Sequence, residues 1–359
     1  MSLESRTSED QINRRGFLRD TAVATAGLVA GVPALRAADA PAGAKPLNYN
    51  PDMEYRRLGK TGLQISAVCL GGHWKRIDTV ASGGTDSPDF QKNRYEVVTR
   101  CIERGMNYID ACTSDEVMVY SRALKGRRDK MHLGFSWYEE EMRNPEYRTT
   151  AKLLGTLEKG MKQAGLDYVD LWRITLLEQS GQHTPAEIDA LMEALQTAKK
   201  QGKARFTGFS SHDRPHIKWM VEAYPQIVDA FCTPYTAKSM VRPTDSLFDA
   251  VRKQDVGVFG IKPFASNSLF KGSSALDHPM AAEDSRIARL AIRNILSNSA
   301  ITAPIPGLIN LQQVDNAAQA VRERRQLDRT EQADLQRAGE RMWAMLPPDY
   351  QWLKDFELV

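Results

Sequence analysis

Acidic side chains gather in one short segment of this sequence. Asp110, Asp115 and Glu116 fall within seven residues, and such a cluster can bind a cation or divide the roles of acid and base. Glu116 also has a simpler interpretation, because an acidic residue at the start of a helix is stabilised by the helix dipole. His73 and Trp74 directly follow an expected strand, where they either contact a substrate or pack. We take Asp110, Asp115 and His73 as the candidate acid–base residues.

Other polar clusters carry less information. His212 and His216 share one helix face, but no third ligand accompanies them, and none of the four cysteines forms a C-x-x-C pair. We therefore predict no metal site. Arg173 and Glu178 flank an expected strand and either bind a polar ligand or pair with each other. The acidic run 139–141 is most simply a solvated loop or a helix start.

Short apolar runs alternate with longer amphipathic stretches along the chain. The expected strands are 65–71, 106–112, 131–137, 168–175, 205–210, 228–235, 256–264 and 301–305. The expected helices are 93–104, 117–124, 149–164, 186–201, 214–223, 246–253, 279–297 and 312–322. Eight nearly continuous apolar strands, each followed by a helix, predict an α/β fold of the (β/α)8 TIM barrel type.

The surroundings of the first strand support this choice. An open doubly wound sheet would be expected to carry a G-x-G-x-x-G loop after an early strand, whereas residues 71–74 read Gly-Gly-His-Trp. Residues 55–64 place turn glycines between β-like arms, which predicts an N-terminal hairpin that caps the barrel floor. A C-terminal helix is expected after the barrel. In such barrels the chemistry lies at the carboxyl ends of the strands.

Composition places the chain among soluble globular proteins. It has 359 residues, 42% of them hydrophobic and 26% charged, with a net charge of +3. This balance gives no reason to expect a nucleic-acid partner or an anionic membrane surface. The expected partner is a small-molecule substrate.

The N-terminus is typical of an export signal. Arg14 and Arg15 precede a weakly apolar stretch at 21–33, and small residues follow at Ala37, Ala38 and Ala40. This pattern predicts a twin-arginine signal peptide and linker over 1–45, ahead of the barrel over 46–359. The apolar stretch is shorter than the roughly 20 residues that a membrane span needs, so the mature chain is expected to have none. We expect the twin-arginine export machinery as a partner and a periplasmic or extracellular location.

Within this frame the chain resembles the aldo/keto reductase family from about residue 55 to about residue 321. The resemblance rests on 57–63, 105–110, 124–130, 166–171, 202–210 and 305–307, followed by Gln312 and Asn316. The family reduces carbonyls by hydride transfer from a nicotinamide cofactor, helped by an Asp, a Tyr, a Lys and a His at strand ends. The resemblance implies that Asp110 is that Asp. Asp115 stands at the Tyr position, Ser136 at the Lys position and Thr175 at the His position.

The positions that the resemblance assigns to the cofactor are better kept. They are Ser210 and Ser211 for the nicotinamide amide, Lys262, Pro263 and Phe264 for the pyrophosphate, and Ile305, Pro306, Gly307, Gln312 and Asn316 for the adenosine end. Cys232 stands where the family usually has a Gln, and Ile261 where it usually has a stacking Tyr. The adenosine loop is one residue short and lacks the Arg or Lys that would grip a 2′-phosphate, so the expected cofactor is NADP or NAD.

Three functions are consistent with these residues. The first is an oxidoreductase that uses NAD(P) on a carbonyl or alcohol, sugar-like for example, with a non-standard acid–base set. Twin-arginine export of a folded chain would let it carry a cofactor acquired in the cytoplasm. The second is a catalytically silent barrel kept for nucleotide or ligand binding. The third is a non-redox lyase or hydrolase that uses the pocket carboxylates.

Overall fold

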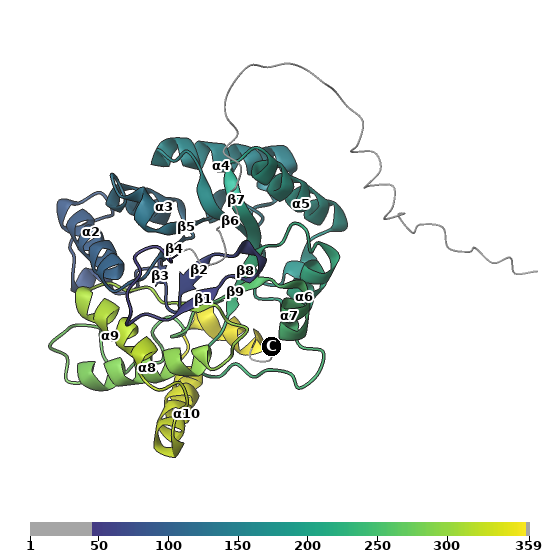
Figure 1. The fold of residues 1–359 in the computed structure, drawn as a ribbon. Coiled ribbons are helices and arrows are strands. Elements are labelled where there is room, and N and C mark those ends of the chain that lie inside the picture. The colour runs from purple at the N-terminus through teal and green to yellow at the C-terminus, as the bar shows by residue number, and fades with distance from the viewer. Residues whose placement is uncertain (1–44, 357–359) are drawn as a thin grey trace, which may run out of the picture. The chain divides into compact units, whose positions relative to one another are not determined.

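Eight parallel strands form the central sheet of this protein, whose structure is a computed structural model that describes residues 45–356 (Figure 1). They run in chain order around the sheet. Their bounds are β3 (Leu70–Gly71), β4 (Tyr108–Ala111), β5 (His132–Phe135), β6 (Val169–Thr175), β7 (Ala204–Ser210), β8 (Ala230–Pro234), β9 (Gly257–Ile261) and β10 (Ala303–Ile305).

Main-chain contacts between the first and last strands close this sheet into a barrel. Gly71 forms a parallel bridge with Gly307. The Gly71 amide donates to the Pro306 carbonyl at 2.8 Å, and the Cys69 amide donates to the Pro304 carbonyl at 3.1 Å. The predicted (β/α)8 TIM barrel is confirmed.

Helices follow the strands and surround the barrel (Figure 1). They are α2 (Pro88–Glu103), α3 (Ser114–Ala123), α4 (Thr150–Ala164), α5 (Pro185–Lys200), α6 (Arg214–Ala223), α7 (Leu247–Gln254), α8 (Ala281–Leu296) and α9 (Leu311–Arg322). Their starts are fixed by the sequence. Helix α5, for example, begins with the capping box of Thr184 and Glu187, with Pro185 in its first turn.

The predicted hairpin is present, but it takes part of the expected first strand. Strands β1 (Tyr55–Arg57) and β2 (Gln64–Ser66) pair antiparallel, so the run 65–71 is divided between the hairpin and the barrel. Arg57 pairs with Asp255, just before β9, which places the hairpin at the amino ends of the strands. The buried Leu58 packs there with barrel residues such as Leu171. The hairpin therefore closes the floor, opposite the end where chemistry is expected.

The chain continues beyond the barrel helices. Helix α10 (Arg329–Ala344) is the expected C-terminal helix, and a 3-10 helix at Pro348–Phe356, called here the C-terminal segment, follows it. Leu335 and Leu353 from these elements share an apolar cluster with Leu290 of α8 and Leu269 after β9. Within residues 45–356, no helix has the length and apolar character needed to cross a membrane.

Candidate active site

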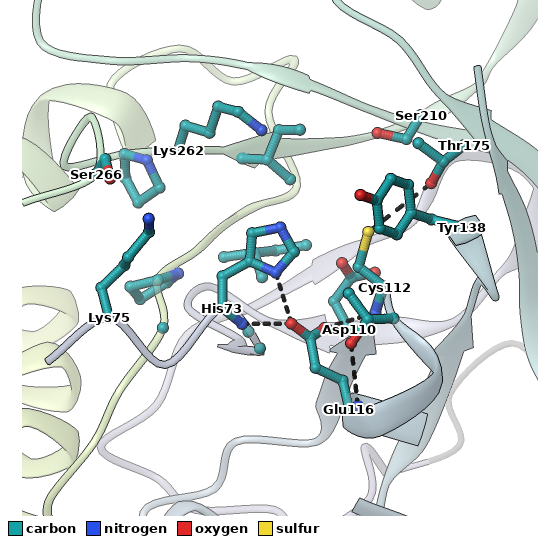
Figure 2. A pocket seen from close by; sticks show the side chains of 18 of the residues that line it. His73, Lys75, Asp110, Cys112, Glu116, Tyr138, Thr175, Ser210, Lys262 and Ser266 are labelled. Atoms are coloured by element: carbon teal, nitrogen blue, oxygen red, sulfur yellow. Dashed lines mark hydrogen bonds and ion pairs between the residues drawn. The ribbon is translucent and has the colours of Figure 1, made fainter. Parts of the chain in front are cut away.

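A cavity of about 490 Å³ opens at the carboxyl ends of the strands. Asp110 of β4, Thr175 of β6, Ser210 of β7 and Ile261 of β9 all line it. Lys75 and Lys262 lie on one side of the view in Figure 2, and Thr175 and Ser210 lie on the other. The strand ends thus bring together residues that are far apart in the sequence, as this type of barrel requires.

Asp110 is held at the base of the cavity by a buried arginine. Arg173 Nε donates to Asp110 Oδ1 at 2.6 Å, and Arg173 Nη2 donates to Oδ2 at 2.5 Å. Both side chains are almost fully buried, so each charge depends on the other for compensation. Arg173 Nη1 also lies 3.3 Å from Thr175 Oγ1. Arg173 therefore pairs with Asp110 and not with Glu178, which pairs with Arg143 at 3.5 Å.

A histidine–carboxylate pair stands at the mouth of the cavity. His73 Nδ1 lies 2.5 Å from Glu116 Oε1, which also accepts from the His73 amide, and Glu116 Oε2 accepts from the Cys112 amide at 2.7 Å (Figure 2). The Glu116 side chain is 4% exposed and that of His73 is 49% exposed. Burial raises the pKa of Glu116, but His73 and the amide donors outweigh burial and hold the pKa below its ordinary value.

The local backbone explains how this pair forms. Glu116 lies in the first turn of α3, whose cap is Thr113, and from there its carboxylate reaches back to the loop after β3. Gly72 leaves room for that carboxylate, because a Cβ at this position would come within 1.9 Å of it. His73 adopts a positive φ of 53°, which costs energy for a residue with a side chain. The backbone is therefore strained at the residue that pairs with Glu116.

Asp115 does not join the site. It is exposed in the first turn of α3 and does not line the cavity. Successive helix residues point about 100° apart, so α3 turns Glu116 inward and Asp115 outward. Tyr120, on the same helix, is buried in the wall, donates to the Gly71 carbonyl at 2.6 Å and accepts from Trp74 at 2.8 Å.

A buried hydrogen-bond network occupies the Lys and His positions of the family pattern. Ser136 Oγ lies 2.9 Å from Thr175 Oγ1 and donates to Glu141 Oε2 at 2.6 Å. Glu141 also accepts from the amides of Thr175 and Trp137. Burial raises the pKa of Glu141 to about 7 against these hydrogen bonds. The expectation of a solvated segment at 139–141 is therefore wrong for Glu141, which is buried.

The C-terminal segment covers part of the cavity, which sequence reasoning missed. The Trp352 ring stacks on the buried His212 ring at 4.3 Å, and Lys262 Nζ lies 5.5 Å from the Trp352 ring centre. Burial, with positive charges that include Lys262, lowers the pKa of His212 well below its ordinary value. Enclosure away from water also lowers the pKa of Lys262 to about 8. Local sequence patterns carry no signal for a contact between residues so far apart.

Most positions assigned to the cofactor lie along two adjoining cavities. The large cavity is lined by Ser210, Lys262, Pro263, Phe264, Ile305, Pro306 and Gly307. A smaller cavity of about 100 Å³ is lined by Gln312 and Asn316, and shares Lys75, Phe264, Asn267 and Gly307 with the large one. Ser211 lines neither, because it is buried and its Oγ donates to Ser180 at 2.7 Å.

The residues that line these two cavities are suited to hold a dinucleotide. A nicotinamide would lie by Ser210 and Ile261 in the large cavity, and an adenosine would lie in the small one. Lys75 and Lys262 offer positive charge near the residues that the two cavities share. Asn310 lines the small cavity, and its buried Nδ2 has no hydrogen-bond partner among residues 45–356. Such a donor is costly unless a ligand or water accepts from it.

Comparisons with known proteins identify one family. The model of the Aldo/keto reductase family matches residues 79–340. The chain is 23% identical over 317 residues to "Uncharacterized oxidoreductase YrpG" of Bacillus subtilis, covering 75% of this chain and 91% of that protein. It is 21% identical over 295 residues to the L-galactose dehydrogenase of Arabidopsis thaliana, covering 76% and 89%.

Two further similarities complete this picture. The chain is 24% identical over 243 residues to the L-glyceraldehyde 3-phosphate reductase of Escherichia coli K12, covering 63% of this chain and 65% of that protein. The holo form of aldo-keto reductase AKR11C1 from Bacillus halodurans superposes with a TM-score of 0.59 at 21% identity, covering 80% of this chain and 96% of that one. At this level of identity the structural similarity supports the fold alone.

Proposed function

Because the chain belongs to the aldo/keto reductase family of oxidoreductases, we propose that it transfers hydride between NAD(P) and a polar, sugar-like carbonyl or alcohol with a rearranged acid–base set. The observation that carries this proposal is the His73–Glu116 pair at a cavity whose other residues match cofactor positions. Relatives named for L-galactose and L-glyceraldehyde 3-phosphate support a sugar-like substrate. The polar lining by Tyr138, Arg143 and Glu178 supports it as well.

Carbonyl reduction adds a hydride to carbon and a proton to oxygen. When bound, the nicotinamide supplies the hydride. His73 delivers the proton from Nε2, because Glu116 holds the other ring nitrogen and stabilises the charged imidazole before transfer. In the reverse direction the neutral ring accepts the proton.

The Asp110–Arg173 pair supports this chemistry without exchanging protons. Asp110 fixes the guanidinium by two hydrogen bonds, so that Nη1 faces Thr175 and Cys112 at the cavity wall. A fixed positive charge at this position stabilises the negative charge that develops on a carbonyl oxygen during hydride addition. Asp115, which is exposed away from the cavity, has no part in this scheme.

One experiment decides between this proposal and its alternatives. The purified protein is denatured, any released nucleotide is identified by mass spectrometry, and turnover of aldoses and aldehydes is measured with NADH and NADPH. Binding with turnover that falls in His73→Ala supports the proposal. Failure to bind either dinucleotide refutes it. Binding without hydride transfer indicates a silent barrel. Conversion of a sugar without external cofactor, once bound dinucleotide is excluded, indicates a lyase or hydrolase.

We also propose that the chain is exported by the twin-arginine machinery to the periplasm or beyond, with its cofactor bound before export. The supporting pattern, Arg14 and Arg15 ahead of the apolar stretch 21–33, lies outside the described residues. Cell fractionation tests this. Replacing both arginines by lysine should retain the protein in the cytoplasm, and an unchanged distribution between fractions argues against this route.

A further inference from the structure

The small cavity is built for a neutral ligand group rather than for a phosphate. Resting on the proposed function, we propose that it takes an adenosine without a 2′-phosphate, so that the protein binds NAD(H) in preference to NADP(H). The residues that carry this inference are Asn310 and Asp284, which line the small cavity, and Arg289 of α8.

Asn310 offers a neutral donor to this cavity. It is 8% exposed and caps α9, where its Oδ1 accepts from the Gln313 amide at 2.8 Å. The amide nitrogen Nδ2 is buried and has no partner in the described part of the chain. A ribose hydroxyl is an acceptor of matching charge and size, and it would satisfy this donor without bringing a charge into the cavity.

The start of α9 has already used amides that could bind an anion. A helix N-terminus attracts phosphate through its free amides and its dipole. Here Asn310 takes the Gln313 amide, and the Gln313 side chain accepts from the Ile309 amide at 2.9 Å. A phosphate that bound these two amides would have to displace both side-chain acceptors. The helix end therefore offers a strong anion fewer amides than an uncapped helix would.

The charges around the small cavity also oppose a 2′-phosphate. The Asp284 carboxylate lines the cavity, fixed by the amides of Lys271 and Gly272 at 2.9 and 2.6 Å. Arg289 does not line the cavity and is held by Glu323 at 2.7 Å and Asn316 Oδ1 at 2.6 Å. A phosphate monoester carries a charge of about −1.5 to −2, so it would face the Asp284 carboxylate, whereas the nearby Arg76 guanidinium already donates to the Gly272 carbonyl.

Lys75 is the one lysine or arginine among the described side chains that line the small cavity. It is exposed and belongs to the wall that the two cavities share. Its charge is therefore available to the pyrophosphate, which NAD and NADP have in common, and does not distinguish them. The discrimination falls on Asn310, Asp284 and the first turn of α9.

The test compares dissociation constants of NADH and NADPH for the purified protein, measured by titration of nicotinamide fluorescence, and needs no turnover. We expect NADH to bind at least about tenfold more tightly. Equal binding, or tighter binding of NADPH, overturns the preference and leaves the proposed function standing. Failure of both to bind overturns the proposed function, and the preference with it.

Variants locate the cause of the preference. Gln312→Arg adds a guanidinium where exposed Gln312 lines the small cavity, and should strengthen NADPH binding at least about tenfold with little change for NADH. Gln319→Arg, on an exposed position of α9 outside the cavity, is the matched control. Asn310→Ser keeps a capping oxygen but removes the amide donor, and should weaken NADH binding. Equal responses of the two arginine variants contradict the inference.

Discussion

Arg173 binds Asp110 through both carboxylate oxygens, with Nε at 2.6 Å from Oδ1 and Nη2 at 2.5 Å from Oδ2. The family pattern places a lysine near this aspartate, at the position held here by Ser136. In this chain the positive charge comes from the middle of β6 instead. The Asp110 charge is thus compensated from a different strand, by a planar and permanently charged guanidinium in place of an ammonium.

Loss of one partner of this pair should destabilise the fold. Arg173→Met leaves the Asp110 carboxylate buried without compensation, so the free energy of unfolding should fall by ~3–5 kcal/mol. Asp110→Asn combined with Arg173→Met removes both charges and should recover part of this loss. Chemical denaturation of both variants measures the effect. A single variant as stable as the wild-type protein would show that the pair carries little of the folding energy.

The His73–Glu116 pair should control turnover. His73→Ala removes the proposed proton donor and should lower kcat by about 100-fold or more, whereas the dissociation constant of NADH should change little. Glu116→Gln keeps a hydrogen-bond acceptor but loses the charge that stabilises charged His73, so it should lower kcat and alter the pH profile. His216→Ala, outside the cavity on α6, is the control. Turnover of His73→Ala within about twofold of wild type rules out this role.

Glu141 should make stability depend on pH. Burial raises its pKa in the folded protein to about 7 from an ordinary value of 4.5, so the fold favours the protonated form. Its contribution is fully present below the unfolded pKa and is lost as the pH rises through the folded pKa. Relative to Glu141→Gln, the wild-type protein should lose up to ~3 kcal/mol of unfolding free energy between about pH 5 and about pH 8.

Glu140→Gln provides a matched control for this measurement. Glu140 is the adjacent residue and pairs with Lys159 near the surface, so the same chemical change should have only a small effect on the pH dependence. Urea denaturation at a series of pH values compares the three proteins. Parallel curves for wild type and Glu141→Gln would show that Glu141 titrates normally.

Trp352 should keep His212 uncharged. Trp352→Ala opens the stacked ring to water, so the pKa of His212 should rise toward its ordinary value, which an NMR titration of the imidazole can follow. Trp219 stacks on His216 at 5.2 Å in a comparable pair. Trp219→Ala, which removes the ring stacked on a different histidine, is the control and should leave the pKa of His212 unchanged. An unaltered His212 titration in Trp352→Ala would mean that other residues bury this ring.

The sequence predicts the parts of this site that depend on local pattern. Asp110 and Thr175 could be placed at strand ends because apolar runs define the strands. The sequence also contains a signal for Arg173, the partner of Asp110. Residues 171, 173 and 175 share one face of β6, Leu171 on that face lies inside the barrel, and an arginine on an inward face needs a counter-charge.

Other parts depend on contacts that no local pattern contains. Glu141 belongs to an acidic run that is typical of a solvated loop, and only the path of that loop buries it between β5 and β6. The choice between Asp115 and Glu116 depends on where α3 begins, which sequence reasoning fixes to within a few residues at best. Trp352 reaches the cavity through the packing of α10 on α8.

The bridge between Gly71 and Gly307 lies where β3 and β10, the two shortest strands of the barrel, meet. Gly307 borders both cavities, so a molecule lying across them would touch both sides of this junction and hold the two strands together. Its binding energy would then oppose opening of the wall, by mass action. Slower hydrogen exchange at the Cys69 and Gly71 amides in the presence of the bound molecule would show this stabilisation directly. The loaded protein should then resist unfolding that begins where β3 and β10 meet.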